Sequence, residues 1–260
     1  MSDVAAPTGA AFLQLVGDPL RWSLLEHLRA SDRRVGDLVE LTGRPQNVVS
    51  YHLGELRSAG LVSGRRSSAD GRDTYYRVHL DRFGTLLGEA ASALDPHLRL
   101  TSAEPGRVTA RRRPRVLFLC TGNSARSQIA EALTTHRSEG TVDARSAGSH
   151  PKPLHPNAVR VLAERGIDIA GATSTHVDAV RRLRFDRVVT LCDKVKEVCP
   201  ELPGAPRTGH WSIGDPATTA ASDTGTYPAF VTTAADIDLR VGLLLAELQA
   251  DSQEVRRAGR

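Results

Sequence analysis

The sequence of 260 residues lacks any hydrophobic run long enough to cross a lipid bilayer, which takes roughly 18 consecutive apolar residues. Its first residues, MSDVAAPTGAAFLQLVG, also lack the basic start of a secretory signal peptide. We therefore expect a cytoplasmic protein without a membrane partner.

Cysteine is scarce, and the three that occur lie in the second half of the chain: Cys120, Cys192 and Cys199. An odd number of thiols in a reducing compartment argues against a structural disulfide framework. Buried apolar thiols, metal ligation and catalysis remain as explanations. No CxxC or HxxxH spacing accompanies these cysteines, so we expect no metal site and no bound cofactor.

Aromatic residues make up only 4% of the chain, too few for the stacking platforms that bind single-stranded nucleic acids. The charge excess is also small, with a formal net charge of +4 shared between the two halves. Charge alone is therefore weak evidence for nucleic-acid binding, because most arginines can be solvated surface residues.

The length of the chain indicates two domains, because 260 residues exceed the usual size of one domain. Residues 1–98 have the pattern of helices followed by a hairpin, and residues 114–250 that of alternating strands and helices. The stretch between them, 99–113, has the composition of a linker. We assign residues 251–260 to a C-terminal tail.

Turn and capping signals divide residues 10–60 into three short amphipathic helices. Asp18 and Pro19 match the N-cap and the first position of a helix, and Gly43 and Gly60 stand where helices end. In the third helix an apolar stripe leaves polar residues of types that read DNA grooves near the N-terminal, outward side: Gln46, Asn47, Ser50 and Tyr51.

A β-hairpin follows in LVSGRRSSADGRDTYYRVHL, where two β-prone segments flank a polar tip with an Asp-Gly pair. Three arginines lie at this tip: Arg65, Arg66 and Arg72. Residues 81–98 can form a further helix rich in leucine and alanine. The predicted fold of this half is mostly α with a β-hairpin.

The order of these elements resembles that of the ArsR-like winged helix-turn-helix regulators, and GDPLRWSLLEHL, QNVVSYHLGELRSAGLV and RRSSADGRDTYYRV carry the likeness. The resemblance implies that the helix from Gln46 to Arg57 enters the major groove of double-stranded operator DNA and that the hairpin wing touches phosphates. It also implies a homodimer through this domain. The alternative is a helical domain that has lost DNA binding and only mediates dimerisation.

From Pro114 onward, four β-prone runs alternate with helical patterns: RVLFLC, TVDARSAG, FDRVVTLC and RTGHW. Short β-rich runs separated by helices favour a doubly wound parallel sheet. The predicted fold of residues 114–250 is therefore α/β with a four-stranded parallel sheet, completed by a helix near residues 227–248.

The most informative stretch is VLFLCTGNSARSQIAEAL, in which a buried strand ends on Cys120 and Arg126 completes a Cys-x5-Arg motif. A loop between a strand and a helix can turn its N–H groups around a tetrahedral oxyanion, and Arg126 adds a planar bidentate donor. The same field stabilises Cys120 as a thiolate nucleophile. We assign the loop to substrate binding: Thr121, Gly122, Asn123, Ser124, Ala125 and Arg126.

The segments CTGNSARS, RSAGSHPKPLHPNAV and HWSIGDPA resemble the low-molecular-weight protein tyrosine phosphatases and the arsenate reductases built on that fold, over about residues 115–248. The resemblance implies that Asp215, in an Asp-Pro pair, protonates the leaving group. The alternative is a turn aspartate before proline. Ser127 can donate a hydrogen bond to the Cys120 sulfur, or it can simply be a serine at a helix N-terminus.

The other two cysteines distinguish the reductases from the phosphatases. Cys192 ends the segment FDRVVTLC and Cys199 follows seven residues later. The thioredoxin-coupled arsenate reductases have a second and third cysteine in a segment similar to VVTLCDKVKEVCP, whereas phosphatases of this fold need no further thiols. The resemblance implies a relay from Cys120 to Cys192 to Cys199, driven by an external reductant, thioredoxin or a low-molecular-weight thiol.

The sequence thus favours a DNA-binding regulator of arsenic resistance fused to an arsenate reductase. Two alternatives remain: a regulator fused to a tyrosine phosphatase, and a regulator whose phosphatase-like domain only senses an oxyanion. Some family members bind a monovalent cation through residues similar to Asn123, Glu131, Ser146 and Thr173. Thr175 stands where such members have a carboxylate, so we do not predict potassium dependence.

Overall fold

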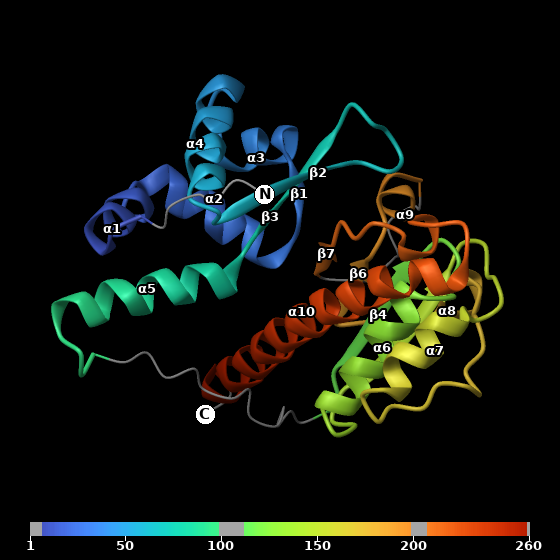
Figure 1. The fold of residues 1–260 in the computed structure, drawn as a ribbon. Helices are drawn as coiled ribbons and strands as arrows, with labels where there is room; N and C mark the ends of the chain where they lie inside the picture. The colour runs from blue at the N-terminus through green and yellow to red at the C-terminus, as the bar shows by residue number, and fades with distance from the viewer. Residues whose placement is uncertain (1–6, 99–111, 199–206, 259–260) are drawn as a thin grey trace. The chain divides into compact units, whose positions relative to one another are not determined.

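The computed structural model describes residues 7–98, 112–198 and 207–258. Cys199 and most of the expected linker lie outside the described residues. The chain divides into two units, residues 1–102 and 103–260, which we call the N-terminal and the C-terminal unit (Figure 1). Across the described ranges, no helix is both long enough and apolar enough to cross a membrane.

The N-terminal unit begins with two helices, α1 (Gly9–Val16) and α2 (Pro19–Ala30). Asp18 caps α2 as expected, because its Oδ1 accepts two backbone N–H groups of the first helical turn at 2.9 Å each. Pro19 fits the first position because its fixed φ suits a helix and its missing N–H is not needed there. Helix α1 is not among the predicted helices, because its sequence GAAFLQLV is almost wholly apolar and a short apolar run shows no helical period.

Helices α3 (Val35–Thr42) and α4 (Gln46–Ser58) form the predicted helix pair. Gly43 ends α3 with a φ of 63°, and Gly60 follows α4 with a φ of 71°, so both predicted helix ends are confirmed. The segment Arg33–Arg34 is a short strand, β1, rather than part of the second helix, because it pairs with the hairpin.

A small antiparallel sheet in the order β1-β3-β2 forms the wing. Strands β2 (Val62–Arg66) and β3 (Thr74–Val78) are the predicted hairpin, and helix α5 (Leu80–Leu94) follows them. One apolar core joins helices and hairpin, and its members include Phe12, Leu24, Leu28, Leu38, Val49, Leu53, Leu56, Leu61 and Leu86. The predicted winged helix-turn-helix fold is confirmed.

The C-terminal unit is built on a sheet in the order β5-β4-β6-β7, in which all neighbouring strands are parallel. The strands are β4 (Arg115–Cys120), β5 (Asp143–Gly148), β6 (Arg187–Thr190) and β7 (Thr208–His210). The chain passes from β4 to β5 on one side and then to β6 on the other, so the sheet is doubly wound as predicted. Sheets of this kind bind ligands at the carboxyl ends of the two strands beside the reversal, here β4 and β6.

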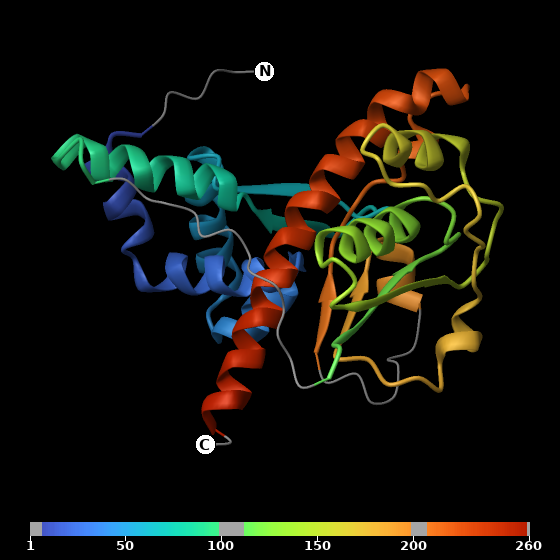
Figure 2. The ribbon, with the colours of Figure 1, turned by 90° about the horizontal axis from the view of Figure 1, so that it is seen from below.

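Among its described residues the unit also has the helical segments α6 (Arg126–Arg137), α7 (Pro156–Ala163), α8 (Val177–Val180), α9 (Asp193–Val198), the 3-10 turn η1 (Pro216–Thr218) and α10 (Asp223–Ala258). Helix α10 lies along α6 and also contacts α7 (Figure 2). Its predicted apolar stripe is buried: Phe230, Ala234, Ile237, Val241, Leu244 and Leu248.

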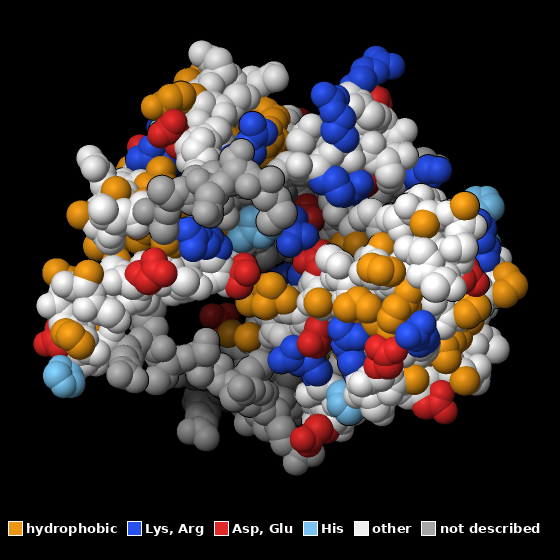
Figure 3. All heavy atoms as spheres, viewed as in Figure 1, with side chains coloured by type: hydrophobic (Ala, Val, Ile, Leu, Met, Phe, Trp, Pro, Cys, Tyr) orange, Lys and Arg blue, Asp and Glu red, His pale blue; other side chains and the backbone are white. Residues whose placement is uncertain are grey.

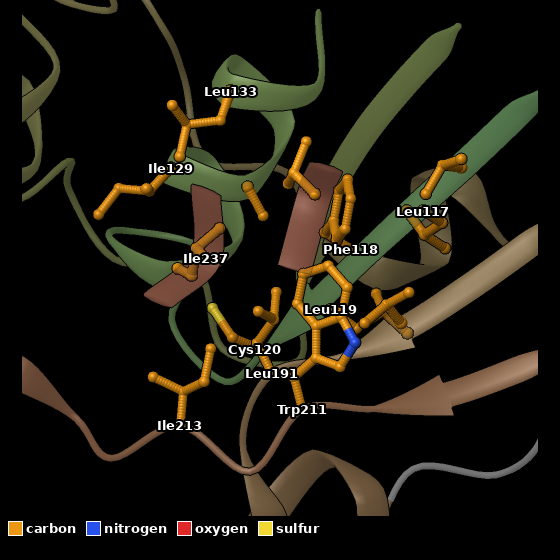
Figure 4. Close-up of a cluster of buried hydrophobic side chains, with 14 of the residues drawn as sticks. Leu117, Phe118, Leu119, Cys120, Ile129, Leu133, Leu191, Trp211, Ile213 and Ile237 are labelled. Carbon is orange, nitrogen blue, oxygen red and sulfur yellow. The ribbon is translucent and has the colours of Figure 1, made fainter. Parts of the chain in front are cut away.

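Apolar side chains enclose the end of β4. Figure 4 shows Cys120 among Leu191, Ile213 and Ile237, which come from three other segments of the chain. Nearby, the rings of Phe118 and Trp211 pack with their centroids 5.8 Å apart. The carboxyl end of β4 therefore carries a buried cysteine.

Candidate active site

The loop after β4 depends on one left-handed residue and on a close approach to β5. Asn123 adopts a φ of 46°, which asparagine tolerates better than most residues. Gly148 ends β5 opposite Cys120, and a Cβ atom at Gly148 would lie 2.6 Å from the Thr121 carbonyl oxygen. Only glycine therefore allows the loop to pack this closely against β5.

The carbonyl groups of the loop point away from its centre, because each accepts a hydrogen bond from another segment. The Ser174 hydroxyl donates to the Asn123 carbonyl at 2.8 Å. Three backbone N–H groups donate to the others at 2.8 to 2.9 Å: His150 to Thr121, Lys152 to Gly122, and His155 to Ser124. In a trans peptide the C=O and the next N–H point in opposite directions, so the N–H groups of residues 122–125 face the inside of the loop. This is the nest of donors that an oxyanion site requires.

Cys120 is buried, and two donors point at its sulfur. The backbone N–H of Asn123 donates to Sγ at 3.2 Å, and the Ser127 hydroxyl oxygen lies 2.9 Å from Sγ. Thr175 N–H donates to Asn123 Oδ1 at 2.7 Å, so the amide nitrogen of Asn123 faces Ser127 and donates to its Oγ at 2.9 Å. A Cys120 thiolate has no proton to give, so in that state the Ser127 hydroxyl donates to Sγ while its lone pair accepts from Asn123. A nucleophilic thiolate needs donors in these positions.

Arg126 begins α6 and is buried, with 6% of its surface exposed. Its Nη1 donates to the Ile213 carbonyl at 2.8 Å, and its Nη2 donates to Asp215 Oδ2 at 2.9 Å. The Asp215 side chain is 45% exposed and caps the turn η1, where Oδ1 accepts from Ala217 N–H at 3.2 Å. The structure thus brings together the cation and the acid of the predicted site.

A second thiol lies at the same edge of the sheet. Cys192 follows β6, the parallel neighbour of β4, and is buried with 2% exposed. Its Sγ lies 3.3 Å from Oγ1 of Thr121, the residue directly after Cys120. The ends of β4 and β6 flank the reversal of the sheet, which explains how residues 72 positions apart reach one place. Cys199 lies outside the described residues, so its part in the site stays a prediction.

The residues similar to a monovalent-cation site gather beside the loop. Asn123 Nδ2 donates to Ser146 Oγ at 2.7 Å, and Gln128 Nε2 donates to the Thr173 carbonyl at 3.1 Å. Burial raises the pKa of Glu131, while hydrogen bonds from Ser146 oppose that shift. In the described ranges no group of three or more His, Cys, Asp or Glu residues is placed to hold a metal ion.

The predicted DNA-contacting residues of the N-terminal unit lie at its surface. Exposed side chains on α4 are Gln46, Asn47, Ser50, Tyr51 and Arg57. In the wing Arg66 and Arg72 are exposed and Arg65 is half-buried. Figure 3 shows Lys and Arg side chains gathered over the β2–β3 hairpin. Helix α4 and the wing therefore offer polar and positively charged groups to solvent.

Comparison with known protein families finds one match in each unit. Residues 115–254 match the model of the low molecular weight phosphotyrosine protein phosphatases, which is more than half of the chain. The chain belongs to the low molecular weight phosphotyrosine protein phosphatase family. Residues 18–63 match the arsR family of bacterial regulatory proteins, so an ArsR-family helix-turn-helix domain is fused to the phosphatase-fold domain.

Several curated relatives of this chain are described as arsenate reductases. One from Halalkalibacterium halodurans is 39% identical over 115 residues, which cover 44% of this chain and 83% of that protein. Another from Shouchella clausii is 42% identical over 104 residues, covering 39% of this chain and 73% of that protein. A solved structure of an arsenate reductase from Archaeoglobus fulgidus is 35% identical and covers 50% of this chain and 98% of that chain, with a TM-score of 0.42.

The sequence did not predict two sets of residues that lie around the loop after β4. The first comprises Ser174 and the segment 149–155, which bond the loop carbonyls mainly through backbone groups and so leave no side-chain signal. The second is the buried pair Asp193 and His210, which are hydrogen-bonded at 3.1 Å. His210 lies in HWSIGDPA and Asp193 in VVTLCDKVKEVCP, both quoted above for the family resemblance, but neither segment predicts that the two side chains meet.

Proposed function

We propose that the C-terminal unit is an arsenate reductase and that the N-terminal unit is a DNA-binding regulator of arsenic resistance. The observation that carries the reductase assignment is the second thiol, Cys192, whose sulfur contacts Thr121 in the loop of residues 121–126, which we call the anion loop. A phosphatase of this fold needs one nucleophilic cysteine and has no use for a second thiol there. The relatives described as arsenate reductases support the same choice.

The first step binds arsenate, a tetrahedral oxyanion, among the N–H groups of residues 122–125 and the Arg126 guanidinium. The Cys120 thiolate attacks arsenic, with its sulfur oriented by Ser127 and the Asn123 amide. Asp215 gives a proton to the departing oxygen, which leaves as water. The product is a covalent adduct between Cys120 and arsenic(V).

The second step is the reduction. The Cys192 thiolate attacks the Cys120 sulfur, an S–S bond forms, and the S–As bond breaks with its electron pair remaining on arsenic. Arsenic leaves as arsenite, and the two thiols supply the two electrons. Cys199 then attacks Cys192 and frees Cys120, after which an external thiol, thioredoxin or a low-molecular-weight thiol, reduces the Cys192–Cys199 disulfide.

The N-terminal unit would bind double-stranded operator DNA as a homodimer. The exposed residues Gln46, Asn47, Ser50, Tyr51 and Arg57 of α4 suit the major groove, and the wing arginines suit phosphates. Large apolar side chains left exposed on this unit support pairing with a second copy: Leu13 at 45%, Trp22 at 48% and Leu94 at 80%.

Arsenite release from arsenate tests the reductase proposal, measured with a thioredoxin system, with a low-molecular-weight thiol, and without reductant. We expect turnover only with a reductant, and none for Cys120→Ser, because a serine alkoxide does not form readily at neutral pH. Reductant-independent hydrolysis of p-nitrophenyl phosphate without arsenite formation would favour the phosphatase alternative. Anion binding with neither activity would favour the oxyanion sensor.

Binding to duplexes selected from a random library tests the DNA proposal. Arg66→Ala and Arg72→Ala should weaken binding to all selected duplexes and reduce the salt dependence of the affinity, because a phosphate contact releases counterions. Asn47→Ala should instead alter the selected sequence. Failure of the full-length protein to retain any duplex would contradict the assignment.

A further inference from the structure

A buried polar cluster adjoins Cys192. Asp193 has no exposed surface and His210 is 1% exposed. Asp193 Oδ1 accepts a hydrogen bond from His210 Nε2 at 3.1 Å and another from the Ser212 hydroxyl at 2.8 Å. Burying such groups is costly unless they are well paired, so apolar residues would have filled this space at less cost. The cluster therefore calls for an explanation beyond packing.

His210 holds the chain on both sides of Cys192. Its Nδ1 lies 2.8 Å from Thr190 Oγ1 and 3.1 Å from the Thr190 carbonyl, at the end of β6. Its Nε2 bonds Asp193, the first residue of α9. One imidazole thus fixes both ends of a short arch that consists of Leu191 and Cys192.

The arch is also attached to the strand that carries the first thiol. Leu191 N–H donates to the Leu119 carbonyl at 2.7 Å, and the Cys192 sulfur contacts Thr121 Oγ1 at 3.3 Å. In thiol-disulfide exchange the attacking sulfur must reach the sulfur it attacks from the side opposite the breaking bond. A displaced arch would therefore slow the attack of Cys192 on Cys120.

We infer that His210 and Asp193 are positioning residues for Cys192, which hold the arch so that the Cys192 sulfur reaches Cys120. This inference rests on the proposed arsenate reductase function. In the step concerned the Cys192 thiolate forms a bond to the Cys120 sulfur, the S–As bond breaks, and its electron pair leaves with arsenite. Asp193 and His210 take no part in these bond changes.

The test compares Asp193→Ala with Asp193→Asn, each in a Cys199→Ser background, where the Cys120–Cys192 disulfide accumulates. Alanine removes the hydrogen bonds that the carboxylate accepts from His210 and Ser212, whereas the asparagine oxygen can still accept from both. After mixing with arsenate and quenching by alkylation, we expect Asp193→Ala to form the disulfide about 10²-fold more slowly than its parent. Asp193→Asn should keep most of the parent's rate.

A second readout separates positioning from a general loss of structure. Protection of Cys120 by phosphate against iodoacetamide reports on the anion loop, and it should be unchanged in both variants. Asp251→Asn is the matched control, because Asp251 on α10 pairs with Arg187 and Arg207. These two arginines lie at the amino ends of β6 and β7, away from the anion loop. This variant should lose stability and keep the disulfide rate.

An unchanged rate in Asp193→Ala would overturn the inference, as would a rate in Asp193→Asn as low as that in Asp193→Ala. If Asp193→Ala also loses phosphate protection, the disulfide rate is measured in His210→Gln instead. A glutamine amide cannot bond Thr190 and Asp193 together as the imidazole ring does. An unchanged disulfide rate in His210→Gln would then refute the role. If the Cys199→Ser parent forms no Cys120–Cys192 disulfide with arsenate, the reductase proposal fails and the inference falls with it.

Discussion

The Arg126 guanidinium and the Asp215 carboxylate are joined by an ion pair of 2.9 Å, although one side chain is buried and the other nearly half exposed. The pair links the beginning of α6 with the Asp-Pro turn before α10, so the groups proposed to bind the anion and to donate the proton are positioned by each other. The second guanidinium nitrogen is held by the Ile213 carbonyl at 2.8 Å. This part of the site is thus assembled from two separate stretches of the C-terminal unit, the start of α6 and residues 213–215.

Replacing Arg126 with lysine should lower kcat/KM for arsenate by about 10²-fold or more, because one ammonium cannot make the planar fork that matches two oxyanion oxygens. Lysine also cannot bond Ile213 and Asp215 in the same geometry. Steady-state arsenite release checks this, with Arg137→Lys as the control, since Arg137 lies on the same helix and pairs with Asp238 at the surface. Equal efficiency of Arg126→Lys and wild type would show that the loop N–H groups alone bind the anion.

Asp215→Asn should reduce the rate of adduct formation by about 10²-fold to 10⁴-fold, because asparagine cannot donate the proton that the departing oxygen needs. The affinity for phosphate should change little, since the loop and Arg126 remain. Single-turnover kinetics measure the rate and phosphate protection of Cys120 measures the affinity. A loss confined to affinity would mean that Asp215 serves only to orient Arg126.

Gly148→Ala should disrupt the anion loop, because the added Cβ atom would lie 2.6 Å from the Thr121 carbonyl oxygen and 2.9 Å from the Asn123 backbone nitrogen. A displacement of about 1 Å in the loop costs roughly 10²-fold in rate. Gly171→Ala is the control, since a Cβ atom there would meet nothing within 4 Å. Comparable arsenite release by the two variants would contradict the packing of the loop against β5.

Asp18→Ala should destabilise the N-terminal unit by about 1 kcal/mol at pH 7, through loss of the N-cap of α2. The hydrogen bond from Arg21 N–H, more than any other contact, holds the pKa of Asp18 below its ordinary value of 3.8. A lowered pKa means that the carboxylate stabilises the fold above pH 3.8 and that this contribution disappears as the pH falls through the folded-state pKa.

Trp22 fluorescence during thermal unfolding follows this unit when Trp211→Phe is present in both the variant and its parent. The difference in melting temperature should therefore be largest near neutral pH and shrink below pH 3.8. A difference that stays constant from pH 7 to pH 3 would show that the charge of Asp18 plays no part in the cap.

Local patterns predict most of this fold. The four β-rich runs predicted in the second half form the four parallel strands of the sheet. Cys120 and Arg126 lie at the two ends of the predicted turn, because the Cys-x5-Arg motif joins strand and helix within seven residues. The wing followed from two β-prone segments around an Asp-Gly pair. In each case the signal lies within a window of about twenty residues, where hydrophobic period and turn chemistry decide the structure.

The undetected features depend on contacts between distant segments. Three donors to the loop carbonyls are backbone N–H groups of His150, Lys152 and His155, which every sequence possesses, and the fourth is the hydroxyl of the distant Ser174. His210 meets Asp193 only because β7 lies beside β6 in the finished sheet. Helix α1 was missed for a different reason, since its short segment GAAFLQLV is almost wholly apolar and shows no helical period.

Mass mapping of the Cys199→Ser protein after one exposure to arsenate tests the central claim most directly. We expect one arsenite released per chain, followed by arrest with Cys120 and Cys192 joined in a disulfide, because no third thiol can move the oxidation onward. Sustained turnover by this variant, or arsenite release without a Cys120–Cys192 bond in the trapped protein, would contradict the proposed thiol relay.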